Sequence, residues 1–138
     1  FNTYGPRMRP DDGRVIPNFV SQALDGRDLT VYGDGSQTRS FCYVDDLIAG
    51  LRALMDTEGL QGEVVNLGSD DEITILDLAE EIIDLCDTTS ELTHEPLPED
   101  DPGRRRPDLT KARDLLGFDV ETDLRRGLRL TVRQFSRA

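Results

Sequence analysis

The sequence contains one histidine, two cysteines and no tryptophan. His94 stands alone in an acidic stretch, which excludes a Ser-His-Asp triad, a Cys-His pair and a histidine-rich metal site. We therefore expect neither a catalytic residue nor a metal ligand in this chain. Cys42 and Cys86 lie far apart in apolar surroundings, which favours reduced thiols in the cytoplasm over a disulfide.

Positive charge is also scarce, because Lys111 is the single lysine among 16 cationic residues that face 28 acidic ones. The net charge of −12 argues against sequence-independent binding to nucleic acid or to an anionic membrane. No apolar run approaches the ~20 residues of a membrane-spanning helix, and no signal-peptide pattern is present. We interpret the acidic residues as a solvated surface and hypothesise an adaptation to high salt.

Short β-branched runs alternate with amphipathic segments, which predicts an α/β fold. The predicted strands are too few and too short for an independent doubly wound sheet. Helices are expected over residues 15–24, from Asp45 or Asp46 as N-cap to residue 55, over 75–85 and 110–116, and from Asp123 to residue 135. Strands are expected over 29–32, 40–44, 62–68 and 91–95, with a polar, proline-containing loop over 96–107.

The sequence opens at Phe1 without an initiator methionine, and its first aromatic residues meet a Gly-Pro break. This pattern is typical of the last residues of a strand that runs into a loop. We therefore expect residues 1–138 to be a segment of a larger chain.

Arginines are the residues that point to a ligand. Arg39 lies between a glycine-rich turn and an extended run, and Arg104, Arg105 and Arg106 lie in the long loop. Guanidinium groups form paired hydrogen bonds to phosphate oxygens, so a strand arginine and a loop arginine can clamp a diphosphate. The alternative is that they only offset neighbouring acids. Tyr32 can stack on a base or be a partly buried strand tyrosine.

Six ordered motifs together resemble the extended short-chain dehydrogenase/reductases that act on nucleotide sugars. They are Phe1-Asn-Thr-Tyr-Gly-Pro-Arg-Met8, Asp12-Gly-Arg-Val15, Leu29-Thr-Val-Tyr-Gly-Asp-Gly-Ser-Gln-Thr-Arg39, Tyr43-Val-Asp-Asp-Leu47, Asn66-Leu-Gly68 and Asp101-Pro-Gly-Arg-Arg-Arg-Pro-Asp108. The resemblance covers essentially the whole sequence. The last motif has the form Asp-Pro-x-x-Arg-x-Pro-Asp, which is similar to the UDP-glucuronate decarboxylase subgroup; 4-epimerases and 4,6-dehydratases usually carry Arg-x-Gly-Asp or Arg-Pro-Gly-His-Asp there.

The resemblance implies that residues 1–138 are the C-terminal, substrate-binding part of an extended Rossmann-type fold. The glycine-rich dinucleotide loop and the Tyr-x-x-x-Lys pair of the family belong upstream and are not found in this sequence. This chain alone is therefore expected to be inactive. The intact protein would use NAD as cofactor, decarboxylate UDP-glucuronate to UDP-xylose and form a homodimer.

The resemblance also implies roles for individual residues in binding the UDP-sugar. Asn2 matches an asparagine that bonds the diphosphate, and Arg39 an arginine that contacts it. Thr30, Val31 and Tyr32 match a short strand that receives the uracil and its ribose. Arg105 matches a loop arginine that closes the phosphate site.

Three further residues are placed near the cofactor or the nucleotide by the same resemblance. Thr3 matches a residue near the nicotinamide, and Arg14 with Val15 match a helix start that approaches the cofactor and the nucleotide. Two alternatives stay open at this point. The protein can be a 4,6-dehydratase acting on dTDP-glucose or a 4-epimerase acting on UDP-glucose, or this chain can be a non-catalytic nucleotide-binding module.

Overall fold

A computed structural model describes residues 1–99 and 102–137. The elements follow one another as β1 (Thr3–Tyr4), α1 (Val15–Leu24), β2 (Leu29–Tyr32), β3 (Thr38–Ser40), β4 (Cys42–Tyr43), α2 (Val44–Asp56), β5 (Glu72–Thr74), α3 (Ile75–Cys86), β6 (Leu92–Glu95), β7 (Arg104–Arg105), α4 (Thr110–Leu116) and α5 (Leu124–Phe135). The expected α/β class is confirmed. Asp101, the first residue of the last motif, lies outside the described residues.

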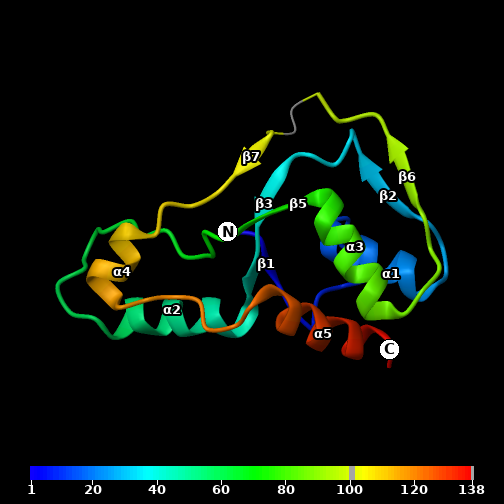
Figure 1. The fold of residues 1–138 in the computed structure, drawn as a ribbon. Coiled ribbons are helices and arrows are strands. Elements are labelled where there is room, and N and C mark those ends of the chain that lie inside the picture. The colour runs from blue at the N-terminus through cyan, green and yellow to red at the C-terminus, as the bar shows by residue number, and fades with distance from the viewer. Residues whose placement is uncertain (100–101, 138) are drawn as a thin grey trace.

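The larger lobe contains α1, α3, β2 and β6, with α5 along one side (Figure 1). Strands β2 and β6 pair in parallel, with Leu29 opposite Leu92. Helices α1 and α3 each direct an apolar face into one core, as the helical spacing of their apolar residues requires. The fully buried side chains of this core include Phe19, Val20, Leu29, Val31, Leu78, Ile82 and Leu128.

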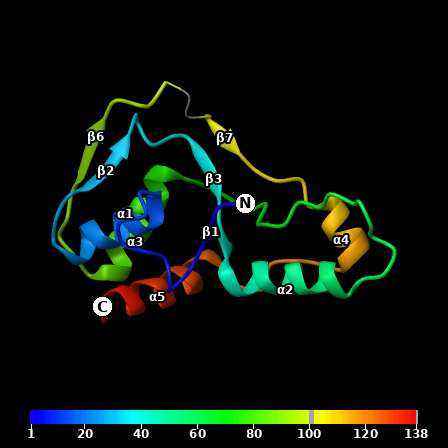
Figure 2. The same cartoon turned by 180° about the vertical axis from the view of Figure 1, so that it is seen from behind.

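The smaller lobe holds α2 and α4 (Figure 2). Leu67, Ala112 and Phe118 form its own small core. Gly50 on α2 makes this packing possible, because a Cβ at that position would lie 2.7 Å from the Phe118 ring. The smaller lobe is thus fixed by close helix packing rather than by a sheet.

A three-stranded sheet in the order β5-β3-β7 connects the two lobes. Strand β3 runs antiparallel to β5 and parallel to β7, which sets Arg39 directly opposite Arg105. The sheet therefore brings β7 alongside β3 (Figure 1), so that Arg105 lies next to Arg39 although they are 66 positions apart in the sequence.

Several expectations from the sequence are confirmed. The helices over residues 15–24 and 110–116 and the strand over 29–32 have the expected bounds. Gly117 ends α4 in the left-handed conformation, with φ of 60°. Asp123 caps α5, because its carboxylate accepts a hydrogen bond from the Arg126 N–H at 2.9 Å. Both cysteines are free thiols.

The expected cap of α2 is wrong. Tyr43 occupies the N-cap position, and Asp45 and Asp46 lie in the first turn of the helix. The Asp46 carboxylate instead accepts hydrogen bonds from the backbone N–H and the hydroxyl of Thr122, at 3.1 and 3.3 Å. Asp46 thus connects α2 to the segment that precedes α5.

Two strand expectations also need correction. Residues 62–68 form no strand, since no strand of the described residues pairs with this segment, and the Val64 side chain is 80% exposed. The extended run expected over 40–44 is divided between β3 and β4, and Val44 already begins α2. The long loop contains the unexpected strand β7. None of the helices in the described residues has the length and apolar character needed to cross a membrane.

Candidate functional site

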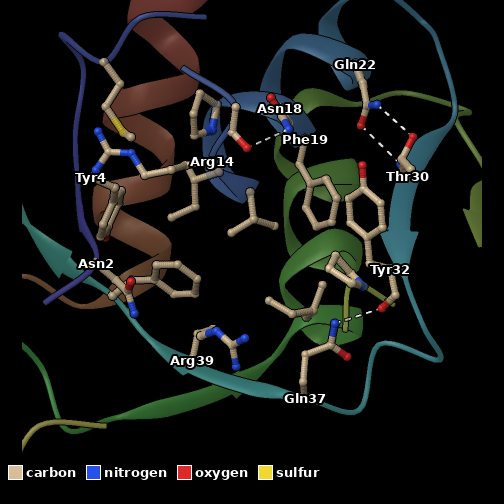
Figure 3. Close-up of a pocket in the computed structure, with 18 of the residues that line it drawn as sticks. Asn2, Tyr4, Arg14, Asn18, Phe19, Gln22, Thr30, Tyr32, Gln37 and Arg39 are labelled. Carbon is tan, nitrogen blue, oxygen red and sulfur yellow. Dashed lines mark hydrogen bonds between the residues drawn. The ribbon is translucent and has the colours of Figure 1, made fainter. Parts of the chain in front are cut away.

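A cavity of about 630 Å³ opens between the N-terminal segment, the start of α1, β2 and β3 (Figure 3). Seven of the nine residues expected at the site line it, namely Asn2, Thr3, Arg14, Val15, Thr30, Tyr32 and Arg39. Val31 and Arg105 do not line it. The cavity therefore gathers residues from four successive segments of the first 41 residues.

Strand β2 forms one wall and offers an open main-chain edge to the cavity. Its other edge is taken by β6, since the Leu29 N–H donates to the Glu91 carbonyl at 2.9 Å and the Gly33 N–H to the Glu95 carbonyl at 2.8 Å. Main-chain groups alternate in direction along a strand. The N–H and C=O groups of Thr30 and Tyr32 therefore point away from β6. The Val31 side chain is buried in the core, so only its backbone lies near the site.

Two glutamine side chains bind this open edge, and the sequence reasoning missed both. Gln22 on α1 donates to the Thr30 hydroxyl at 3.0 Å and accepts from the Thr30 N–H at 3.2 Å. Gln37 donates to the Tyr32 carbonyl at 2.8 Å (Figure 3). Gln22 lies seven residues after Val15 and so on the same face of α1, a spacing that could have indicated it.

A polar wall of the cavity is built by the cationic Arg39 and the neutral amide of Asn2. Arg39 is 8% exposed, and its guanidinium donates to the Thr38 carbonyl at 2.7 Å. Asn2 has φ of 44°, in the left-handed region, and its amide donates to the Ser40 carbonyl at 3.0 Å. Asn2 and Arg39 are therefore positioned by β3 before any ligand arrives, which lowers the entropy cost of binding.

Arg105 lies on β7 beside this wall. Side chains that face each other in a parallel pair leave the sheet on the same side, so the register directs Arg39 and Arg105 to one face. Arg105 is exposed, and its guanidinium makes no ion pair with another described residue. Arg104 and Arg106 differ from it, because they bind Glu72 and the Asp70 carbonyl.

Thr3 and Arg14 are the two residues that the resemblance assigns to the cofactor. Thr3 is on β1, and Arg14 occupies the N-cap position of α1. The Arg14 guanidinium is paired with the Asp12 carboxylate, and its side chain is 61% exposed. Both residues line the cavity, and Arg14 is labelled in Figure 3.

Comparison with known proteins supports the family resemblance of the sequence. Residues 1–68 match the profile of the NAD dependent epimerase/dehydratase family. The expected resemblance is confirmed. A UDP-glucuronic acid decarboxylase 2 of Arabidopsis thaliana is 52% identical over 135 residues, which are 98% of this chain and 30% of that protein.

Solved structures show the same fold. The epimerase Mth375 of Methanothermobacter thermautotrophicus superposes with a TM-score of 0.95 at 34% identity, over 99% of this chain and 41% of that one. A UDP-glucuronic acid 4-epimerase of Bacillus cereus, solved with UDP-glucuronic acid and NAD, gives 0.92 at 31% identity, over 99% and 43%. The chain spans about a third of the length of the curated relatives it matches.

Proposed function

We propose that the full-length protein is an NAD-dependent UDP-glucuronate decarboxylase that forms UDP-xylose, and that this chain holds the UDP moiety. The identity of about half of all positions to decarboxylases, over nearly the whole chain, carries the proposal. Identity to the solved 4-epimerase is lower, at 31%. The decarboxylase-like order of aspartate, proline and arginines in the last motif points the same way.

The β2 edge is suited to uracil, which carries an N–H donor between two carbonyl acceptors. The Thr30 carbonyl can accept from that N–H and the Tyr32 N–H can donate to a neighbouring carbonyl, while Gln22 and Gln37 occupy the other two groups of the edge. The Tyr32 side chain is 47% exposed, so its ring can cover the ribose or the base.

The diphosphate would lie against Asn2 and Arg39, and Arg105 would close over it. Guanidinium bonds to phosphate are charge-assisted and stronger than neutral hydrogen bonds. The local cluster of arginines would attract the anion even though the net charge is −12. Fixing the UDP in this way would place the sugar for reaction, and good orientation can contribute roughly 7–11 kcal/mol.

Thr3 and Arg14 would contact NAD, since both are polar and line the cavity. When bound, NAD would supply reversible hydride transfer at C4 of the glucuronate, and the oxidised sugar would lose CO2 as a β-keto acid before it is reduced again. The family resemblance places the glycine-rich loop and the Tyr-x-x-x-Lys pair outside residues 1–138, so we assign no catalytic residue here. We also propose a homodimer and a cytoplasmic location for the intact protein.

The test is to supply UDP-glucuronate and NAD to the full-length protein and to identify the products. We expect UDP-xylose and CO2 in equal amounts. A 4-inverted sugar or a 6-deoxy-4-keto sugar would instead assign a 4-epimerase or a 4,6-dehydratase. Binding of UDP without any turnover would favour a non-catalytic module.

A further inference from the structure

The loop that carries Arg105 has little of its own to hold it in place. Strand β7 is two residues long, and it follows a proline-containing segment without other regular structure in its described part. Short pairings with solvent-exposed hydrogen bonds open easily. Side-chain and loop contacts nevertheless connect this region to β3 and β5. The Thr38 N–H donates to the Gly103 carbonyl at 2.9 Å, the Ser40 hydroxyl donates to the Arg105 carbonyl at 3.5 Å, and Arg104 binds Glu72, with Arg106 Nε a further 3.9 Å from the same carboxylate.

Glu72 is the centre of these contacts. Its carboxylate accepts from Arg104 Nε at 2.8 Å, from Arg104 Nη2 at 2.5 Å and from the Thr38 hydroxyl at 2.8 Å. Glu72 begins β5 and lies opposite Ser40. Glu72 thus joins all three strands of the sheet. Its backbone belongs to β5, and its carboxylate binds Thr38 on β3 and Arg104 on β7.

The pairing is charged and two-pronged, which is the geometry in which an arginine and a carboxylate bind most specifically. The Glu72 side chain is 21% exposed, whereas Arg104 is 63% exposed. The hydrogen bonds from Arg104 and Thr38 lower the pKa of Glu72 below its usual range, so the carboxylate stays charged at neutral pH.

We infer that Glu72 is a positioning residue of the diphosphate site: it fixes β7 through Arg104 and so holds Arg105 beside Arg39. The inference rests on the proposed function, because it assigns the held arginine to UDP binding. Glu72 touches neither the cavity nor Arg105 directly. Its effect would therefore pass through the strand.

Whether Glu72→Gln weakens or strengthens UDP binding separates the positioning role from a through-space effect of the charge. A carboxylate near an anion site repels the ligand, so Glu72→Gln would tighten UDP binding if only through-space charge mattered. Loss of positioning predicts the opposite. We expect calorimetric titration of the full-length protein with UDP to give about tenfold weaker binding for Glu72→Gln than for the wild type.

A double-mutant cycle gives the second readout. Once Arg105 is replaced by alanine there is nothing left for Glu72 to position, so Glu72→Gln should cost little further affinity in the Arg105→Ala background. Glu81→Gln is the matched control: Glu81 pairs with Arg125, has a similar exposure of 26%, and joins α3 to α5 away from the cavity. We expect its UDP affinity to equal that of the wild type.

The outcomes are distinct. If the wild type does not bind UDP, the proposed function and this inference both fail. If the wild type binds UDP and Glu72→Gln binds it equally or more tightly, or if the two losses simply add, only the positioning role fails. Should Glu72→Gln not fold, Arg104→Gln interrupts the same pairing from its exposed partner and should show the same non-additivity with Arg105→Ala.

Discussion

The hydroxyl of Tyr4 occupies the space beside Gly127 in which any other residue would carry its Cβ. A Cβ built on Gly127 would lie 2.0 Å from the Tyr4 oxygen. Tyr4 is 2% exposed, and its hydroxyl donates to the Leu124 carbonyl at 3.3 Å. The N-terminal segment that supplies Asn2 and Thr3 to the cavity is therefore packed directly on α5.

Gly127→Ala should destabilise the protein. Alanine favours a helix by about 1 kcal/mol over glycine, so a loss of stability can only come from the clash with Tyr4. We expect a net loss of about 1–3 kcal/mol, as for other overpacked cores, measured by urea unfolding. Arg129→Ala, at an exposed position of the same helix, should change stability by less than about 0.5 kcal/mol. Equal stability of the two variants would contradict the packing argument.

The elements that the sequence predicted well are those whose information is local. The helix over residues 15–24 has an amphipathic repeat and an Asp-Gly end, and the helix after Asp123 has its own cap. The structure agrees with both. Residues 62–68 have the composition of a buried strand, yet a strand forms only with a partner, and the described residues supply none to this segment.

The residues of the site also divide into those that the sequence indicates and those whose role depends on the fold. The family motifs indicated Arg39 and Tyr32 by position, but no sequence signal showed that β7 sets Arg105 opposite Arg39. Gln22 and Gln37 were missed because a glutamine in a helix or a turn has many possible partners. Their role depends on the fold, which brings both to the open edge of β2.

Arg105→Ala should weaken UDP binding without loss of stability. The side chain is exposed and makes no ion pair with another described residue, so the fold loses nothing. A charge-assisted hydrogen bond contributes about 1.5–3 kcal/mol, which predicts at least tenfold weaker binding of UDP to the full-length protein by titration calorimetry. Arg27→Ala removes another exposed guanidinium, one that pairs with Asp25, and is the control. Equal UDP affinities for the two variants would contradict a role for Arg105 in binding UDP.

The two thiols should resist alkylation in the folded protein. Burial raises the pKa of Cys42 and of Cys86 to about 11, and Cys42 is fully buried. The reactive thiolate is therefore scarce at pH 8. Peptide mapping after treatment with iodoacetamide should show slow labelling of Cys86, slower labelling of Cys42, and full labelling of both in urea. Rapid labelling of native Cys42 would contradict its burial.

Asp70 should stabilise the protein at neutral pH but not in strong acid. Two hydrogen bonds from Arg113, at 2.9 and 3.0 Å, lower the pKa of Asp70. A lowered folded-state pKa adds stability above the unfolded value of 3.8, and this stability is lost as the pH falls through the folded value. Asp70→Asn should cost up to about 1 kcal/mol at pH 7, and the difference should shrink at lower pH.

Asp25→Asn, at a more exposed pair, should show little difference at either pH. If Asp70→Asn lost the same stability at every pH, the loss would come from altered hydrogen-bond geometry and not from the charge of the carboxylate.

Salt should stabilise this protein, because 28 acidic residues face only 16 cationic ones. Raising the KCl concentration from about 0.1 to about 1 M shortens the Debye length from about 10 to about 3 Å. The repulsion among exposed carboxylates is then screened, while hydrogen-bonded pairs at short range are less affected. We expect the thermal midpoint to rise with KCl, and the rise to be smaller in the double variant Asp56→Asn with Glu58→Gln, which neutralises two exposed acids near the end of α2. A midpoint that stays constant or falls would show that the acidic surface carries no net repulsion, and the high-salt hypothesis would have to be given up.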